Sequence, residues 1–150
     1  MSATIITPAA RAADGPDPEM LALAERVARF IATLDDADIQ NVFADRDVTI
    51  IENFVPYRFD GAAAVDRWAA GMRAHREATA DLHHTFGPVQ DYSRTGDLAF
   101  FALPTTWNGT FRGTKFVETG GWAFVLVKQP NGWRVQSYGW AVTGISTPQP

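Results

Sequence analysis

The chain contains no cysteine, and this absence excludes several kinds of site at once. Disulfides, thiolate zinc sites, iron–sulfur clusters and cysteine nucleophiles all need the missing side chain. The 150 residues include three histidines, two of which are adjacent. We therefore expect no metal site built from protein ligands alone, and no cofactor.

The chain also lacks a basic run and a long apolar run. Thirteen Lys and Arg against seventeen Asp and Glu give a net charge of -4, and no basic segment could follow a phosphate backbone. Nucleic acid is therefore not an expected partner. No stretch reaches the ~18 uncharged apolar residues that a membrane-spanning helix needs, so we expect a soluble protein with no membrane contact.

The first residues lack two features of a secretory signal. Thr7 and Pro8 interrupt the apolar region, and no basic segment precedes it, although the Ala-rich ending at Ala13 is similar to a cleavage site. We expect a cytoplasmic protein of one domain, since its length is typical of a single domain. The predicted parts are a disordered leader over residues 1–16, the domain over residues 17–144 and a flexible tail over residues 145–150.

Aromatic residues are distributed unevenly, since twelve of the eighteen lie from Phe86 onward. The Ala-rich and charged first half therefore predicts helices, and the second half predicts a sheet. Asp17 and Pro18 are typical of a helix start, and an acidic cluster at residues 35–38 separates the first helix from the second. The predicted helices span residues 18–34, 39–43 and 62–79.

One strand is expected between the second and third helices, at residues 48–57, where β-branched and aromatic residues gather and Pro56 stops the ladder. Four more strands follow, separated by turn signals at residues 95–96, 108–109 and 130–132. These predicted strands span residues 82–92, 97–107, 115–128 and 133–143.

This order of elements excludes a doubly wound parallel sheet. It predicts an α+β fold with three helices packed on a curved antiparallel sheet, as a cone-shaped barrel with a pocket at its open end.

The order and spacing of several short segments resemble the SnoaL-like branch of the nuclear transport factor 2-like superfamily, which includes relatives of ketosteroid isomerase and scytalone dehydratase. The resemblance covers residues 18–143, and its members share a fold but differ in function. The segments that carry it are Asp38-Ile39, Phe43-Ala44-Asp45, residues 48–52, Gly61 and Gly132-Trp133-Arg134-Val135.

Glu52 is the first candidate catalytic residue. The resemblance implies a general base at this position, because the ketosteroid isomerase pattern has a carboxylate nine residues before a glycine, as Glu52 stands before Gly61. Burial among apolar residues would raise the pKa of such a carboxyl toward neutral pH. The resemblance also argues against steroid isomerisation, since Phe30 replaces the tyrosine that donates to the oxyanion and no acid occurs near Trp122. The alternative for Glu52 is a structural carboxylate at the rim.

His83 and His84 are the other candidate catalytic residues, because relatives carry a pocket histidine near this place. A histidine paired with a carboxylate is a credible acid/base couple. Strand alternation lets only one of the two face the pocket and does not tell which. The alternative is a pair of exposed or structural strand histidines.

Further residues are candidates for binding a ligand, through tyrosine hydroxyls, aromatic walls or a second interior carboxylate. Their alternative role is in the core or in a subunit interface. They are Tyr57, Trp68, Trp107, Glu118, Trp122, Tyr138 and Trp140.

Two functions remain open. The first is a cofactor-free acid/base enzyme, of isomerase, dehydratase or cyclase type, that acts on an apolar carbonyl compound. The second is a domain of the same fold that binds a small apolar or aromatic ligand without turnover. Both parities of the long strands are apolar, so we also expect a homodimer that forms through the outer face of the sheet.

Overall fold

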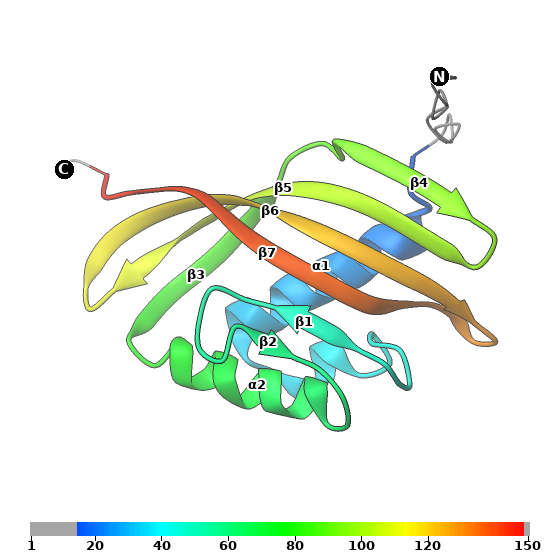
Figure 1. Cartoon of the computed structure of the whole chain (residues 1–150). Helices are drawn as coiled ribbons and strands as arrows, with labels where there is room; N and C mark the ends of the chain where they lie inside the picture. The colour runs from blue at the N-terminus through cyan, green and yellow to red at the C-terminus, as the bar shows by residue number, and fades with distance from the viewer. Residues whose placement is uncertain (1–14, 149–150) are drawn as a thin grey trace, which may run out of the picture.

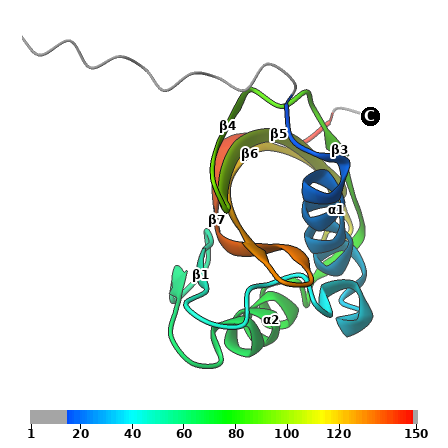
Figure 2. The ribbon, with the colours of Figure 1, turned by 90° about the vertical axis from the view of Figure 1, so that its right-hand side faces the viewer.

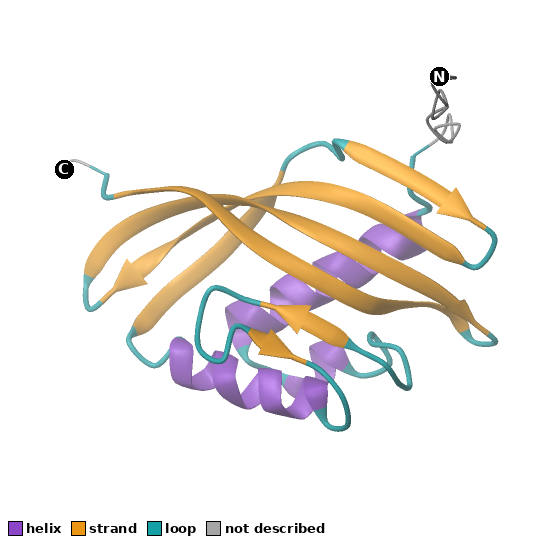
Figure 3. Cartoon of the chain, viewed as in Figure 1, coloured by secondary structure: helices purple, strands orange, loops and turns teal. Residues whose placement is uncertain are grey.

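The computed structural model describes residues 15–148, so the predicted leader falls outside the described residues except for Gly15 and Pro16. Two α-helices, one short 3-10 helix and seven strands make up the fold (Figure 1, Figure 3). None of the helices in residues 15–148 is long and apolar enough to cross a membrane. The elements are α1 (Pro18–Thr33), η1 (Asp36–Ile39), β1 (Thr49–Ile51), β2 (Arg58–Phe59), α2 (Ala64–His75), β3 (Thr79–Phe86), β4 (Asp91–Thr95), β5 (Leu98–Phe111), β6 (Thr114–Gln129) and β7 (Gly132–Ser146).

The seven strands form one sheet in the order β2-β1-β7-β6-β5-β3, and β4 pairs with the first part of β5. All neighbours are antiparallel except β1 and β7, which run parallel with Ile50 opposite Tyr138. The sheet curves around α1 without closing, while α2 lies beside β1 and β2 (Figure 2). The α+β class is confirmed. The sheet is open and curved where a cone-shaped barrel was expected, and the three expected helices are α1, η1 and α2.

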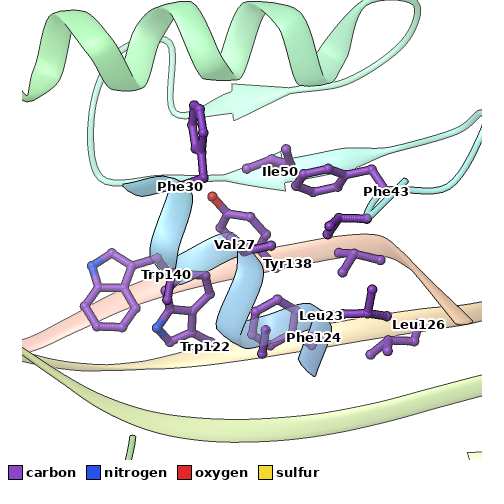
Figure 4. Close-up of a cluster of buried hydrophobic side chains, with 14 of the residues drawn as sticks. Leu23, Val27, Phe30, Phe43, Ile50, Trp122, Phe124, Leu126, Tyr138 and Trp140 are labelled. Atoms are coloured by element: carbon purple, nitrogen blue, oxygen red, sulfur yellow. The ribbon is translucent and has the colours of Figure 1, made fainter. Parts of the chain in front are cut away.

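The core fills the concave side of the sheet. Alternate side chains of β5, β6 and β7 point toward α1, as the period of a strand requires. The apolar stripe of α1 meets them and excludes water from both surfaces (Figure 4). Fully buried members of this core include Val27, Phe30, Phe101, Phe124, Leu126, Trp133 and Tyr138.

Helix α1 begins and ends close to the predicted bounds, but its first turn is capped in a different way from the one predicted. The Asp17 side chain makes no capping bond, and its backbone carbonyl accepts from the Met20 amide instead. The short helix predicted at residues 39–43 is wrong in position. Acidic residues themselves form η1, because the Asp35 side chain caps it and Asp38 accepts from Arg29 on α1 at 2.5 Å.

The strand predicted at residues 48–57 ends at Ile51, because the chain turns where the Tyr57 amide donates to the Phe54 carbonyl and then returns as β2. The strand predicted at residues 82–92 is two strands, β3 and β4, separated at Gly87-Pro88, where proline cannot continue the ladder. The turn predicted at residues 108–109 lies inside β5. The chain reverses instead at Arg112-Gly113, where both residues have positive φ.

Candidate functional site

The site is built around Glu52, which directly follows β1. Strand alternation turns Ile50 and Glu52 to the inside of the sheet and Ile51 to the outside. Glu52 is 5% exposed, which is unusual for a carboxylate. Its Oε1 atom accepts a hydrogen bond from the Trp68 indole at 3.1 Å and another from the Tyr138 hydroxyl.

Three elements bring these groups together. The parallel pairing of β1 with β7 places Tyr138 beside Ile50, two residues from Glu52. Trp68 comes from the buried face of α2, and its ring packs on Phe30 of α1 at a centroid distance of 5.0 Å. The Glu52 carboxyl is therefore oriented by side chains that packing holds in place.

A cavity of about 90 Å³ opens next to Glu52, between the helices and the inner face of the sheet. The Oε2 atom of Glu52 has no hydrogen-bond partner in the described part of the chain, and Glu52 is one of the residues that line this cavity. The cavity is lined by Ile31, Glu52, Asn53, Phe54, Met72, His75, Arg76, Thr79, Leu82, Trp107, Phe116, Glu118, Trp122 and Trp140.

Burial controls the acidity of the groups at the cavity. Desolvation raises the pKa of Glu52 to about 7, the charge of Glu118 acts in the same direction, and the bonds from Tyr138 and Trp68 oppose them. Desolvation also raises the pKa of Glu118, whose Oε1 accepts from the Trp140 indole at 3.2 Å. The pKa of Tyr138 lies well above its usual value, because burial and the neighbouring Glu52 both disfavour a phenolate. Tyr138 is therefore a hydrogen-bond donor at neutral pH.

A groove of about 350 Å³ adjoins the cavity, because the two spaces share several lining residues. Glu118 and His75 border both spaces, and Lys115 and Ile145 border only the groove. The His75 ring stacks on Phe54 at 4.5 Å, and desolvation followed by the charge of Arg76 lowers its pKa. Sequence reasoning missed His75, although its helical spacing from Trp68 and Met72 could have placed it on the inner face of α2.

The predicted ligand-binding residues fall into three groups. Trp107, Trp122, Trp140 and Glu118 line the cavity. Trp68 and Tyr138 hold Glu52 and do not line it. Tyr57 is 57% exposed on the turn before β2 and borders neither the cavity nor the groove, because the predicted strand ends before it.

Neither candidate histidine lines the cavity, so the expected pairing with Glu52 does not form. His84 faces inward, as alternation along β3 allows, but its Nε2 atom lies 2.9 Å from Oε2 of Glu25 on α1. His83 faces outward and is exposed. Its Nδ1 atom lies 3.1 Å from the carbonyl oxygen of Asp81. Within residues 15–148, no group of three or more His, Asp or Glu side chains could hold a metal ion.

A family profile described as a SnoaL-like domain matches residues 18–139. Comparison with curated proteins finds no match. Among solved structures, the fold is similar to the Kfla4162 protein from Kribbella flavida, at 18% identity and a TM-score of 0.71 over 85% of this chain and 90% of that one.

Two further solved structures carry names that refer to an activity. A hexachlorocyclohexane dehydrochlorinase, LinA type 2, is 8% identical with a TM-score of 0.73 over 87% of this chain and 86% of that one. A putative ketosteroid isomerase from Shewanella frigidimarina is 18% identical with a TM-score of 0.62 over 79% of this chain and 91% of that one. At these identities the likeness shows the fold alone.

Proposed function

The chain belongs to the SnoaL-like domain family, and we propose that it is a cofactor-free acid/base enzyme that acts on a small apolar carbonyl compound. The supporting observation is Glu52, a buried carboxylate that lines the cavity. One of its oxygens accepts from two donors, and the other has no partner in the described residues. The isomerase and the dehydrochlorinase named among similar structures are consistent with proton transfer on this fold.

In this mechanism Glu52 removes a proton from the carbon next to the carbonyl group. A pKa of about 7 leaves a large part of the carboxyl ionised at neutral pH and gives it more basicity than an exposed glutamate has. Trp68 and Tyr138 fix Oε1, so that Oε2 is presented to the substrate in one orientation. Isomerisation, dehydration and cyclisation can all begin with this step.

The cavity and the adjoining groove support a substrate with a small reactive group and an apolar or aromatic remainder. The inner cavity of about 90 Å³ has room for the reactive group alone. The groove of about 350 Å³ has room for the remainder, with Phe111, Phe116 and Ile145 on its walls. Aromatic walls favour apolar surface by excluding water from it.

Proton exchange tests this function directly. A panel of ketones and enones is incubated with the protein in D₂O, and deuterium at the α-carbon is followed by NMR. Glu52→Gln should slow exchange of an accepted compound by about 100-fold or more, because general base catalysis contributes at least this factor. Glu77→Gln, at an exposed glutamate outside the cavity, is the matched control. Equal rates in all three proteins would refute Glu52 as the base.

The alternative function is binding of a similar ligand without turnover. The absence of a hydroxyl at Phe30 and of an acid near Trp122 favours it. In that case compounds bind, Glu52→Gln leaves their affinity nearly unchanged, and no bound compound exchanges deuterium. The same panel therefore separates the two functions.

The outer face of the sheet supports a homodimer as the working form. The registers of β1, β7, β6 and β5 align Ile51, Gly139, Ala123 and Ala102 in one outward row. None of these four residues has a polar side chain, and Ile51 is 49% exposed. We propose that a second copy of the chain covers this row.

A further inference from the structure

In residues 15–148, three side-chain atoms are buried and have no hydrogen-bond partner: Arg76 Nε, Trp122 Nε1 and Gln129 Oε1. Two of them belong to residues that line the cavity beside Glu52, and both are donors. Buried polar groups in native proteins are nearly always bonded, so each unpaired group calls for an explanation. A ligand that brings an acceptor into this cavity would supply one.

The Trp122 ring is buried and packed against other aromatic rings. It is 2% exposed and lies on β6, directly opposite Trp140 on β7. Its ring stacks on Phe124 at 5.1 Å and contacts Tyr138 at 5.1 Å (Figure 4). The Trp68 and Trp140 indoles donate to Glu52 and Glu118, whereas the Trp122 indole has no acceptor.

Arg76 adds to the excess of donors. Its Nη1 atom donates to the carbonyls of Ile31 and Ala32 at the end of α1, at 2.5 and 2.8 Å, and this fixes the guanidinium beside the cavity with Nε unpaired. Its charge is partly balanced by these carbonyls, which form the negative end of the helix. The cavity therefore favours a neutral acceptor oxygen over a carboxylate, which Glu52 and Glu118 would repel.

We propose that the Trp122 indole N–H binds the carbonyl oxygen of the substrate, an inference that rests on the proposed function. When Glu52 Oε2 takes the proton, the electrons of the C–H bond form a C=C bond and the carbonyl pair moves onto oxygen. Negative charge then grows on this oxygen, and a hydrogen bond from the Trp122 N–H stabilises the enolate. Return of the proton from Glu52 to a carbon of the enolate completes the step without an oxidant or reductant. The chain has neither the tyrosine nor the acid that would donate a hydrogen bond to this oxygen. In this proposal the Trp122 indole is the donor instead.

A pair of probes that differ only in the acceptor tests this inference. Cyclohexanone carries a carbonyl oxygen, and methylenecyclohexane has a CH₂ group in its place. In ¹⁵N-labelled protein, cyclohexanone should move the Trp122 indole proton downfield, and methylenecyclohexane should not. Trp122→Phe should weaken cyclohexanone binding about five- to tenfold, the factor expected for one hydrogen bond, and change methylenecyclohexane binding much less. Trp133→Phe, at a buried tryptophan outside the cavity, should change neither affinity.

A second variant separates the N–H from the shape of the ring. Replacement of Trp122 by β-(3-benzothienyl)alanine keeps the size of the side chain and removes the donor, so it should reproduce the selective loss of cyclohexanone. If both probes lose affinity equally in both variants, Trp122 only packs against ligands, and this inference fails while the cavity remains a binding site. If the wild-type protein binds neither probe, the proposed function itself fails, and this inference fails with it.

Discussion

At the scale of single residues, the chemistry depends on how Glu52 balances burial against hydrogen bonding. Removal from water disfavours its charged form, while the Trp68 and Tyr138 donors favour it. Burial has the larger effect, so the pKa lies near 7. The same balance has consequences for stability, because the carboxyl ionises near its ordinary pKa once the chain unfolds.

The stability of the protein should therefore fall as the pH rises. The folded state keeps the Glu52 proton between the ordinary pKa of 4.5 and about 7, so the stabilisation is complete below 4.5 and is lost as the pH passes 7. The total change is on the order of 3 kcal/mol. Urea denaturation at about pH 5 and pH 8 should show this loss in the wild-type protein and in Glu77→Gln, and a much smaller one in Glu52→Gln. An equal loss of stability in the wild-type protein and in both variants would contradict this prediction.

Removal of the Tyr138 hydroxyl should raise the pKa of Glu52 further. Tyr138→Phe deletes a donor that favours the carboxylate and leaves the burial unchanged. The pH at which α-proton exchange reaches half of its maximal rate should then move upward. Tyr92→Phe, at a buried tyrosine on β4 that does not touch Glu52, is the control. An unchanged or lower midpoint in Tyr138→Phe would show that the hydroxyl does not set this pKa.

At the scale of elements, the close approach of β6 and β7 decides the shape of the inner wall. The register shifts between Thr119 and Gly120, and this brings Gly120 against the ring of Trp140. A Cβ atom at Gly120 would collide with that ring and with the Ala141 carbonyl. A Cβ atom at the neighbouring Gly121 would meet nothing within 4 Å.

Gly120→Ala should consequently destabilise the protein by about 2 kcal/mol or more, because the backbone carbonyl in its way cannot rotate aside. Gly121→Ala should change the unfolding free energy by less than about 0.5 kcal/mol. Thermal denaturation of both variants checks this difference. Similar stability in the two variants would mean that the close approach of the strands is absent in solution.

The bond between His84 and Glu25 joins edge strand β3 to helix α1. His84→Phe keeps a ring against Trp107 and Phe86 but loses the hydrogen bond, so stability should fall by about 1–2 kcal/mol, a value reduced because Glu25 is half-exposed. His83→Phe, at the exposed neighbour, should have a smaller effect. A double-mutant cycle with Glu25→Gln isolates the pair, and zero coupling would show that the bond contributes nothing.

At the scale of the whole molecule, the outward row of apolar residues predicts the oligomeric state. A lysine at Val125, which faces outward beside Phe100, would bury a charge in the proposed interface. Sedimentation should give twice the chain mass of 16.4 kDa for the wild-type protein and for Ala70→Lys, an exposed position on α2, and a monomer for Val125→Lys. A monomeric wild-type protein at high concentration would refute the dimer.

Local signals predicted some elements well and others poorly. Helix α1 could be predicted because its start signals and apolar spacing lie within one short segment. The strand at residues 48–57 was predicted too long, because β propensity does not tell where a partner strand ends. The turn predicted at residues 108–109 is wrong for the same reason. Pairing with β3 and β6 continues β5 past Gly109 as one strand.

For the candidate site, the spacing of Glu52 to Gly61 predicts an interior carboxylate through the family resemblance, with a rim carboxylate as the alternative. The hydrogen bonds from Trp68 and Tyr138 to Glu52 could not be predicted, because these residues are 16 and 86 positions away from it in the chain. The partner of His84 was missed in the same way, since Glu25 is 59 residues away and lies on another element. Tyr57 is expected at the pocket only if the strand extends to residue 57, whereas Tyr57 lies on the turn that follows β1.

The absence of thiol chemistry, the α+β class and the family can be read from the amino-acid sequence alone, and Glu52 can be named from it as a candidate. These follow from composition, from short-range periodicity and from the spacing of a few residues. The interior position of Glu52, the histidine that faces inward and the indole N–H that lacks an acceptor are known only from the folded chain. Burial and hydrogen bonding depend on contacts between segments far apart in the chain, and packing creates those contacts only when the whole sheet forms around α1.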